Sequence, residues 1–156
     1  MRPTLVRTVV AGVAGGLALA ATMALTFRLI GFGWDGDGFL LDPSLQSNKL
    51  IAVWTRLEPL PLISTKPATM LVGLVLFGVG HALIYRWLAP AWPAGVAPRA
   101  TRLGALVCFL SFGWFEFFTP FNLFGEPVSL ISAQLLFWAA AAAAEALVVA
   151  AIMERA

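Results

Sequence analysis

Four long apolar stretches dominate the pattern of hydrophobic and polar positions along the chain. They cover about residues 5–30, 68–88, 102–119 and 128–153. Because an α-helix rises about 1.5 Å per residue, about 20 residues cross the hydrocarbon core of a bilayer. Pro67, Pro120 and Pro127 stand at three of the boundaries, where a helix begins or ends. The pattern predicts an all-α, integral membrane four-helix bundle that forms a single transmembrane domain over residues 1–156.

The longest connecting segment, residues 31–67, is predicted to be an external loop that contains a short amphipathic helix. An Asp-Pro pair at positions 42–43 is typical of a helix start, and a Glu-Pro pair at positions 58–59 of a stop. Between them, Leu50, Val53, Trp54 and Leu57 recur at helical spacing. We expect a helix of about 14 residues, too short to span, that lies flat at the membrane interface. The alternative is that it plugs the outer end of the bundle.

The first stretch also has features of a signal peptide. Arg2 and Arg7 accompany an apolar run, and small residues occur around Ala18–Ala21. The apolar run continues to Ile30, which is longer than the apolar region of a signal peptide. We therefore expect this stretch to be the first membrane-spanning helix.

Composition favours a lipid environment. The 156 residues are 60% hydrophobic and 12% charged, with a mean hydropathy of +0.89, whereas soluble domains carry about 25% charged residues. The net charge of +2, without a basic patch interleaved with aromatics, gives no reason to expect a nucleic-acid partner. The single cysteine, Cys108, excludes an internal disulfide and is expected to pack as a small hydrophobe.

The distribution of Lys and Arg predicts the orientation. Four spans place both termini on one side, together with six of the ten basic residues: Arg2, Arg7, Arg86, Arg99, Arg102 and Arg155. The other four are Arg28, Lys49, Arg56 and Lys66. By the positive-inside rule, we expect a multi-pass protein of the bacterial inner membrane with both termini in the cytoplasm.

Small residues predict how the helices pack. Gly12, Gly16 and Ala20 recur every four residues in the first stretch, and an alanine run occupies residues 139–144 of the fourth. Since lipid is as apolar as leucine, membrane helices associate through close approach or polar contacts. We expect these residues to pack the bundle, with a homodimer face as the alternative.

Eight aromatic residues cluster at the predicted outer end of the third stretch and in the following turn: Phe109, Phe112, Trp114, Phe115, Phe117, Phe118, Phe121 and Phe124. An aromatic belt at the membrane surface explains such a cluster. Its density also suits a hydrophobic ligand, a lipid or a neighbouring subunit.

A few strongly polar side chains lie within the predicted spans: His81, Tyr85, Glu145, Arg28, Glu116 and Gln134. Charged groups at membrane depth cost several kcal/mol, so they usually face the bundle interior and often serve a function. The alternative is structural, in which paired polar groups hold helices together.

Depth predicts two contacts among these residues. His81 and Glu145 each lie roughly 10–12 Å from the inner boundary, so we expect them to meet, with Tyr85 extending the pair toward the cytoplasm. Arg28 and Glu116 both lie near the outer ends of their helices. We expect a contact between them, directly or through Asn122, with extension of Arg28 to lipid headgroups as the competing arrangement.

We find no motif for a catalytic site, a metal site or a cofactor. The chain lacks HExxH, paired histidines, a phosphate loop and a nucleophile elbow. His81 could supply one axial haem ligand, but the chain has no second histidine for a bis-histidine site.

The glycine-rich first stretch, the Gly78–His81 segment and the short loops resemble the plan of small bacterial four-helix inner-membrane proteins of unknown function. This resemblance implies neither an activity nor a site. Three interpretations follow, of which the sequence favours the first, a structural, accessory or lipid-associated membrane component. The second is a proton-coupled carrier or channel subunit that uses His81 and Glu145 and needs at least a dimer. The third is a membrane enzyme or binder acting on a lipid or quinone, with Arg28, Glu116, Asn122 and Glu126 as its polar groups.

Overall fold

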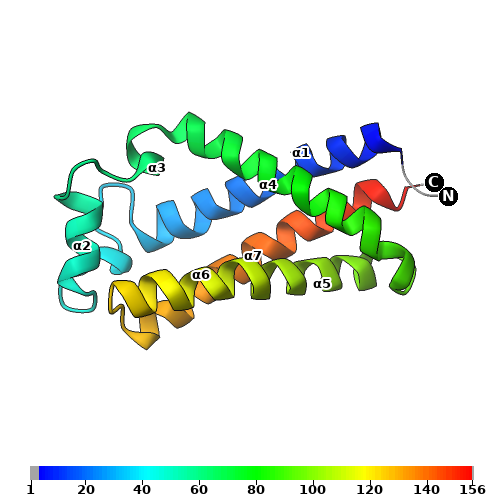
Figure 1. The fold of residues 1–156 in the computed structure, drawn as a ribbon. Helices are drawn as coiled ribbons and strands as arrows, with labels where there is room; N and C mark the ends of the chain where they lie inside the picture. Colours follow the sequence, from blue (N-terminus) through cyan, green and yellow to red (C-terminus); the bar gives the residue numbers. More distant parts are fainter. Residues whose placement is uncertain (1–3, 156) are drawn as a thin grey trace.

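The chain folds as a bundle of four long helical segments, as predicted. A computed structural model describes residues 4–155 and places helices, but no strands, in that range. The four segments, each long and apolar enough to cross a membrane, are Leu5–Gly31, Pro67–Ala91, Val96–Leu123 and Val128–Met153. They run antiparallel in sequence order (Figure 1). We call the end where α1 begins and α7 ends the terminal end, and the opposite end, near α2, the loop end.

The first, second and third segments change helical type before they end, and the fourth does not. The first is α1 (Leu5–Met23) followed by a π-helical segment, Ala24–Gly31. The second is α4 (Pro67–Leu88), which has proline in its first turn and ends in a short 3-10 turn, Ala89–Ala91. The fourth is α7 (Val128–Met153), a continuous α-helix.

The third segment differs most from its predicted bounds. It begins at Val96 as α5 (Val96–Val107) and continues through a π-helical stretch, α6 (Trp114–Glu116) and a second π-helical stretch, Phe117–Leu123. The predicted stop before Pro120 is wrong, since Pro120 lies within the second π-helical stretch. The wider π turn changes which amide each carbonyl bonds, so the helix passes the proline, which has no amide hydrogen to donate.

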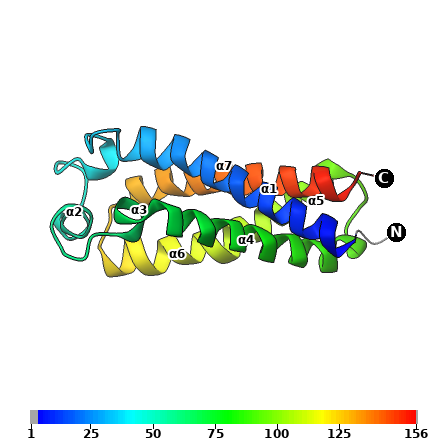
Figure 2. The same cartoon turned by 90° about the horizontal axis from the view of Figure 1, so that it is seen from above.

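α1 packs most extensively against α4 and α7, and α7 also packs against α5 (Figure 2). Gly16 lies on the backbone of α4, and Gly15 faces α7. Gly12 also approaches the α4 backbone, so the predicted glycine face is used within the chain, whereas Ala20 is only partly buried. The alanine run packs on α5 instead, where Gly104 meets Ala142.

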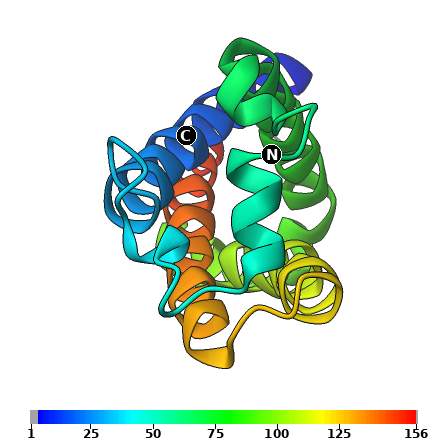
Figure 3. The ribbon, with the colours of Figure 1, turned by 90° about the vertical axis from the view of Figure 1, so that its left-hand side faces the viewer.

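α2 (Asn48–Thr55) lies across the loop end of the bundle (Figure 3). It has eight residues, fewer than predicted, because Ser47 and not Asp42 caps it. The Asp42 carboxylate instead accepts hydrogen bonds from the backbone and hydroxyl of Ser44. The buried face of α2 is formed by Leu50 and Ile51, while Leu57, just after the helix, is exposed.

The remaining short elements complete the loop end. A 3-10 turn, Phe39–Leu41, inserts the buried Leu40 beside Phe27 and Leu130. Another short helix, α3 (Leu62–Thr65), precedes α4. The Ser47 hydroxyl donates to the Phe124 carbonyl at 2.9 Å, and this bond ties α2 to the turn before α7.

Candidate intramembrane polar site

His81 of α4 and Glu145 of α7 form a largely buried pair, which confirms the contact predicted from their matching positions. The His81 Nδ1 and Glu145 Oε1 atoms lie 2.8 Å apart. The Glu145 side chain is 1% exposed and that of His81 is 12% exposed, so the pair is almost fully shielded within the protein. A proton on either residue can be shared across this contact.

Glycine on α1 makes room for the pair. A methyl group on Gly15 would lie 3.3 Å from the Glu145 Cγ and 2.6 Å from a Val149 methyl. Glu145 therefore sits where α1, α4 and α7 meet. Gly78, one turn before His81, lies against the backbone of Gly16 on α1.

The Glu145 carboxyl is only half satisfied. Its Oε2 atom is buried and has no hydrogen-bond partner within residues 4–155. A buried carboxylate is stabilised when both oxygens accept hydrogen bonds, and an unpartnered buried polar atom costs about 1–3 kcal/mol.

Tyr85 does not extend this pair, so that expectation is wrong. Its hydroxyl donates to Glu154 Oε1 at 2.7 Å, and Arg99 Nη1 donates to the same oxygen at 2.6 Å. Burial raises the pKa of Glu154, but these hydrogen bonds and the charge of Arg99 outweigh it, so the pKa lies below 4.5. Tyr85, Arg99 and Glu154 thus form a separate cluster that joins α4, α5 and the end of α7.

The predicted contact between Arg28 and Glu116 is also wrong. Arg28 is exposed and donates to the carbonyls of Gly33 and Trp34, in the loop that folds back over the end of its own helix. Asn122 is exposed as well and does not bridge the two. The two side chains turn to different neighbours, Arg28 to the loop that follows its helix and Glu116 to Trp138 of α7.

Glu116 instead faces α7. It is 1% exposed, and its Oε1 atom accepts a 2.5 Å hydrogen bond from the Trp138 indole. Trp138 also stacks on Phe112, with ring centroids 4.2 Å apart. The aromatic cluster is therefore divided, since Phe112 is partly buried while Phe109 and Phe117 are largely exposed.

Glu126 was not among the polar residues predicted to lie within the spans, yet it is buried. It is 2% exposed, and its Oε1 atom accepts 2.5 Å hydrogen bonds from the side-chain amides of Gln46 and Gln134. Gln134, one of the predicted polar residues of the fourth span, is therefore a hydrogen-bond partner of Glu126. No sequence signal separates Glu126 from an ordinary loop acid, because its burial depends on the segment before α2.

These buried carboxyl groups follow one side of α7. Gln134, Trp138 and Glu145 are separated by four and seven residues, a spacing that keeps them on one helical face. Glu126 and Glu116 bond the first two, and the Oε2 atoms of Glu116, Glu126 and Glu145 all lack hydrogen-bond partners in the described part of the chain.

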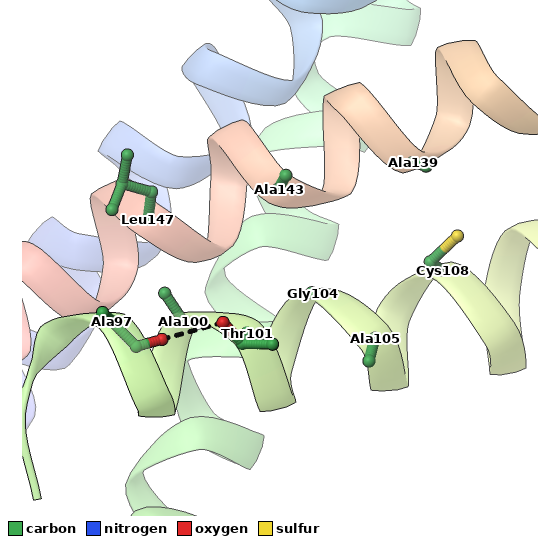
Figure 4. A pocket seen from close by; sticks show the side chains of 9 residues that line it. All are labelled: Ala97, Ala100, Thr101, Gly104, Ala105, Cys108, Ala139, Ala143 and Leu147. Atoms are coloured by element: carbon green, nitrogen blue, oxygen red, sulfur yellow. Dashed lines mark hydrogen bonds between the residues drawn. The ribbon is translucent and has the colours of Figure 1, made fainter.

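An apolar groove of about 530 Å³ runs between α5 and α7 on another side of the bundle (Figure 4). Small side chains line it, among them Ala100, Ala139 and Ala143. Cys108 borders this groove and a neighbouring hollow of about 640 Å³, which the exposed aromatics Phe109, Trp114 and Phe117 help to line.

The site offers no metal-binding cluster within residues 4–155, where no three His, Cys, Asp or Glu side chains come together. Comparison with protein-family models, curated proteins and solved structures gives no match for this chain.

Proposed function

We propose that this protein is a proton-binding membrane component, a subunit of a proton-coupled carrier or channel, in which the His81–Glu145 pair takes up and releases the proton. The 2.8 Å contact between a largely buried imidazole and a buried carboxyl group carries this proposal. Imidazole changes charge near neutral pH. The His81 side chain is 12% exposed, whereas that of Glu145 is 1% exposed, so His81 is the more accessible member of the pair.

The unpartnered Oε2 atom of Glu145 favours this role over a purely structural one. A pair that only joined two helices would be most stable with both carboxyl oxygens bonded. Ionic pairs at such depth also contribute little net stability compared with apolar packing. A single four-helix chain makes a thin wall for a pore, so we propose that it acts as a homodimer or within a larger complex.

Proton flux into liposomes containing the purified protein tests the proposal. After a pH step with the membrane potential clamped, we expect Glu145→Gln and His81→Gln to abolish the flux. Glu58→Gln, which changes an exposed acid of the loop, is the matched control. Unchanged flux in Glu145→Gln, together with lowered thermal stability, would leave the pair only its structural role.

Lipid binding is a second candidate function, supported by the groove between α5 and α7. Its small lining residues leave space for an acyl chain beside the exposed aromatics. Native mass spectrometry should detect retained phospholipid, and Ala143→Leu should reduce it by filling the groove. Ala68→Leu, at an exposed position of α4, should leave the lipid bound.

We further propose that the protein lies in a bacterial inner membrane with the terminal end in the cytoplasm and α2 at the outer interface. The excess of Arg and Lys near the terminal end supports this orientation. Arg2 lies outside the described residues. Among the basic residues that the structure describes near the terminal end, Arg99 pairs with Glu154 and Arg102 is exposed.

A further inference from the structure

We infer that Glu116 and Glu126 form a second proton-binding site at the loop end of the bundle. The inference extends the proposed function, on which it rests, by supplying a place where protons exchange with the outer aqueous side. It starts from two contacts on α7, because Gln134 and Trp138 are one helical turn apart. Gln134 holds Glu126 and Trp138 holds Glu116, so both carboxyl groups lie along the same face.

Both carboxyl groups are bonded through one oxygen only. Glu126 Oε1 accepts from two amides and Glu116 Oε1 from an indole, whereas both Oε2 atoms are buried and unpartnered within residues 4–155. A carboxylate spreads its charge over two equivalent oxygens, and a buried one needs donors to both. A protonated acid carries no charge, so burying one of its oxygens without a partner costs far less than burying a charged carboxylate oxygen. The unpartnered Oε2 atoms therefore favour the acid over the carboxylate.

No basic side chain neutralises either carboxyl group in the described part of the chain. Arg28 and Lys49 of this end both donate to backbone carbonyls, Lys49 Nζ to Leu123 at 2.6 Å, and the other two cations of this end, Arg56 and Lys66, are exposed. Asp42, another acid of the loop end, accepts hydrogen bonds from Ser44. Glu154 at the terminal end shows the contrast, because Arg99 pairs with it directly. A bound proton is therefore the means of neutralising Glu116 and Glu126.

The second site is distinct from the His81–Glu145 pair. Trp138 and Glu145 are seven residues apart, which corresponds to about 10.5 Å along the axis of α7. Glu126 lies two residues before α7, at the loop end of the bundle. On release, the O–H bond of the acid breaks and the proton passes to water. The resulting carboxylate keeps the hydrogen bonds of Gln46 and Gln134 on Oε1.

Infrared spectroscopy of the full-length protein in lipid bilayers tests this inference. Protonated carboxyl groups have a carbonyl stretch that carboxylates lack, and exposed glutamates ionise near pH 4.3. At neutral pH, we expect this absorption in the wild-type protein, with one component lost in Glu116→Gln and another altered or lost in Glu126→Gln. Glu58→Gln should leave it unchanged. Glu116→Asp and Glu126→Asp retain the acid and should shift the band, which keeps the test valid if a glutamine variant folds poorly.

The results separate this inference from the proposed function. If both glutamine variants retain the full wild-type absorption, the two carboxyl groups are ionised and the second site is refuted, whatever Glu145→Gln does to flux. If flux survives Glu145→Gln while the Glu116 and Glu126 bands are lost as expected, the proposed function fails and the second site remains as an isolated proton-binding site.

Discussion

Gly16 of α1 lies so close to Val75 of α4 that a methyl group on Gly16 would be 2.7 Å from the Val75 Cα. This neighbour is backbone and cannot rotate away. The two helices therefore meet without side chains between them, as is common where membrane helices associate through glycine.

Gly16→Ala is expected to destabilise the bundle by about 1–3 kcal/mol, the usual range for overpacking a close contact. Thermal unfolding in detergent measures the effect. Gly80→Ala is the matched control on α4, because no heavy atom would lie within 4 Å of its new methyl group. Alanine favours the helix there, so stability should be unchanged or raised. Equal losses in the two variants would contradict the packing described above.

The His81–Glu145 pair should behave as one energetic unit. His81→Leu leaves a buried carboxyl group without its base, and removing one partner of a buried pair costs about 3–5 kcal/mol. The double variant with Glu145→Leu removes both polar groups and should recover much of that loss. Unfolding of the wild-type protein, both single variants and the double variant gives the coupling energy. Additive effects, within about 0.5 kcal/mol, would show that the two side chains act independently.

Glu154 should make stability depend on pH on the acid side. Burial raises the pKa of its carboxyl group. The hydrogen bonds from Arg99 and Tyr85 and the charge of Arg99 together lower the pKa by more than burial raises it, so it lies below 4.5. A lowered native pKa means that the stabilisation is fully present above pH 4.5 and is lost as the pH falls through the native pKa. Glu154→Gln should lower the melting temperature at neutral pH and reduce its fall in acid. If the melting temperatures of the wild type and of Glu154→Gln fell in parallel as the pH is lowered, this role of Glu154 would be excluded.

Cysteine labelling in intact cells checks the orientation. In a Cys108→Ser background, Asp35→Cys should react with an impermeant thiol reagent and Ala94→Cys should be protected. Both positions are exposed, and they avoid the neighbouring Gly36 and Gly95, whose φ angles of +83° and +110° disfavour other residues. The reverse labelling pattern would place the terminal end outside.

Hydropathy and depth were sufficient to predict the four helices and the contact between His81 and Glu145. Helix length follows from apolar composition, and both residues of this pair also point inward. Depth failed for Arg28 and Glu116, because it does not specify the direction in which a side chain leaves its helix. Arg28 found backbone carbonyls in the adjacent loop, which no periodic pattern indicates.

Burial of Glu126 could not be predicted for a different reason. Gln46, one of its two partners, lies eighty positions away, just before α2. The length of α2 was overestimated because Asp42-Pro43 has the composition of a helix start, while the Asp42 side chain forms a local turn with Ser44. The passage of the third helix through Pro120 likewise depends on a π-helical turn that proline alone does not signal.

The central place of α1 has a consequence for the order in which the protein assembles. α1 is synthesised first, yet its principal partners are α4 and α7, and α7 is synthesised last. Until α7 enters the bilayer, Gly15 faces lipid and α5 lacks the helix against which it packs. A ribosome-bound chain that stops before Val128 therefore holds at most the α1–α4 half of the bundle. Closure of the bundle is then a late event that depends on the last helix.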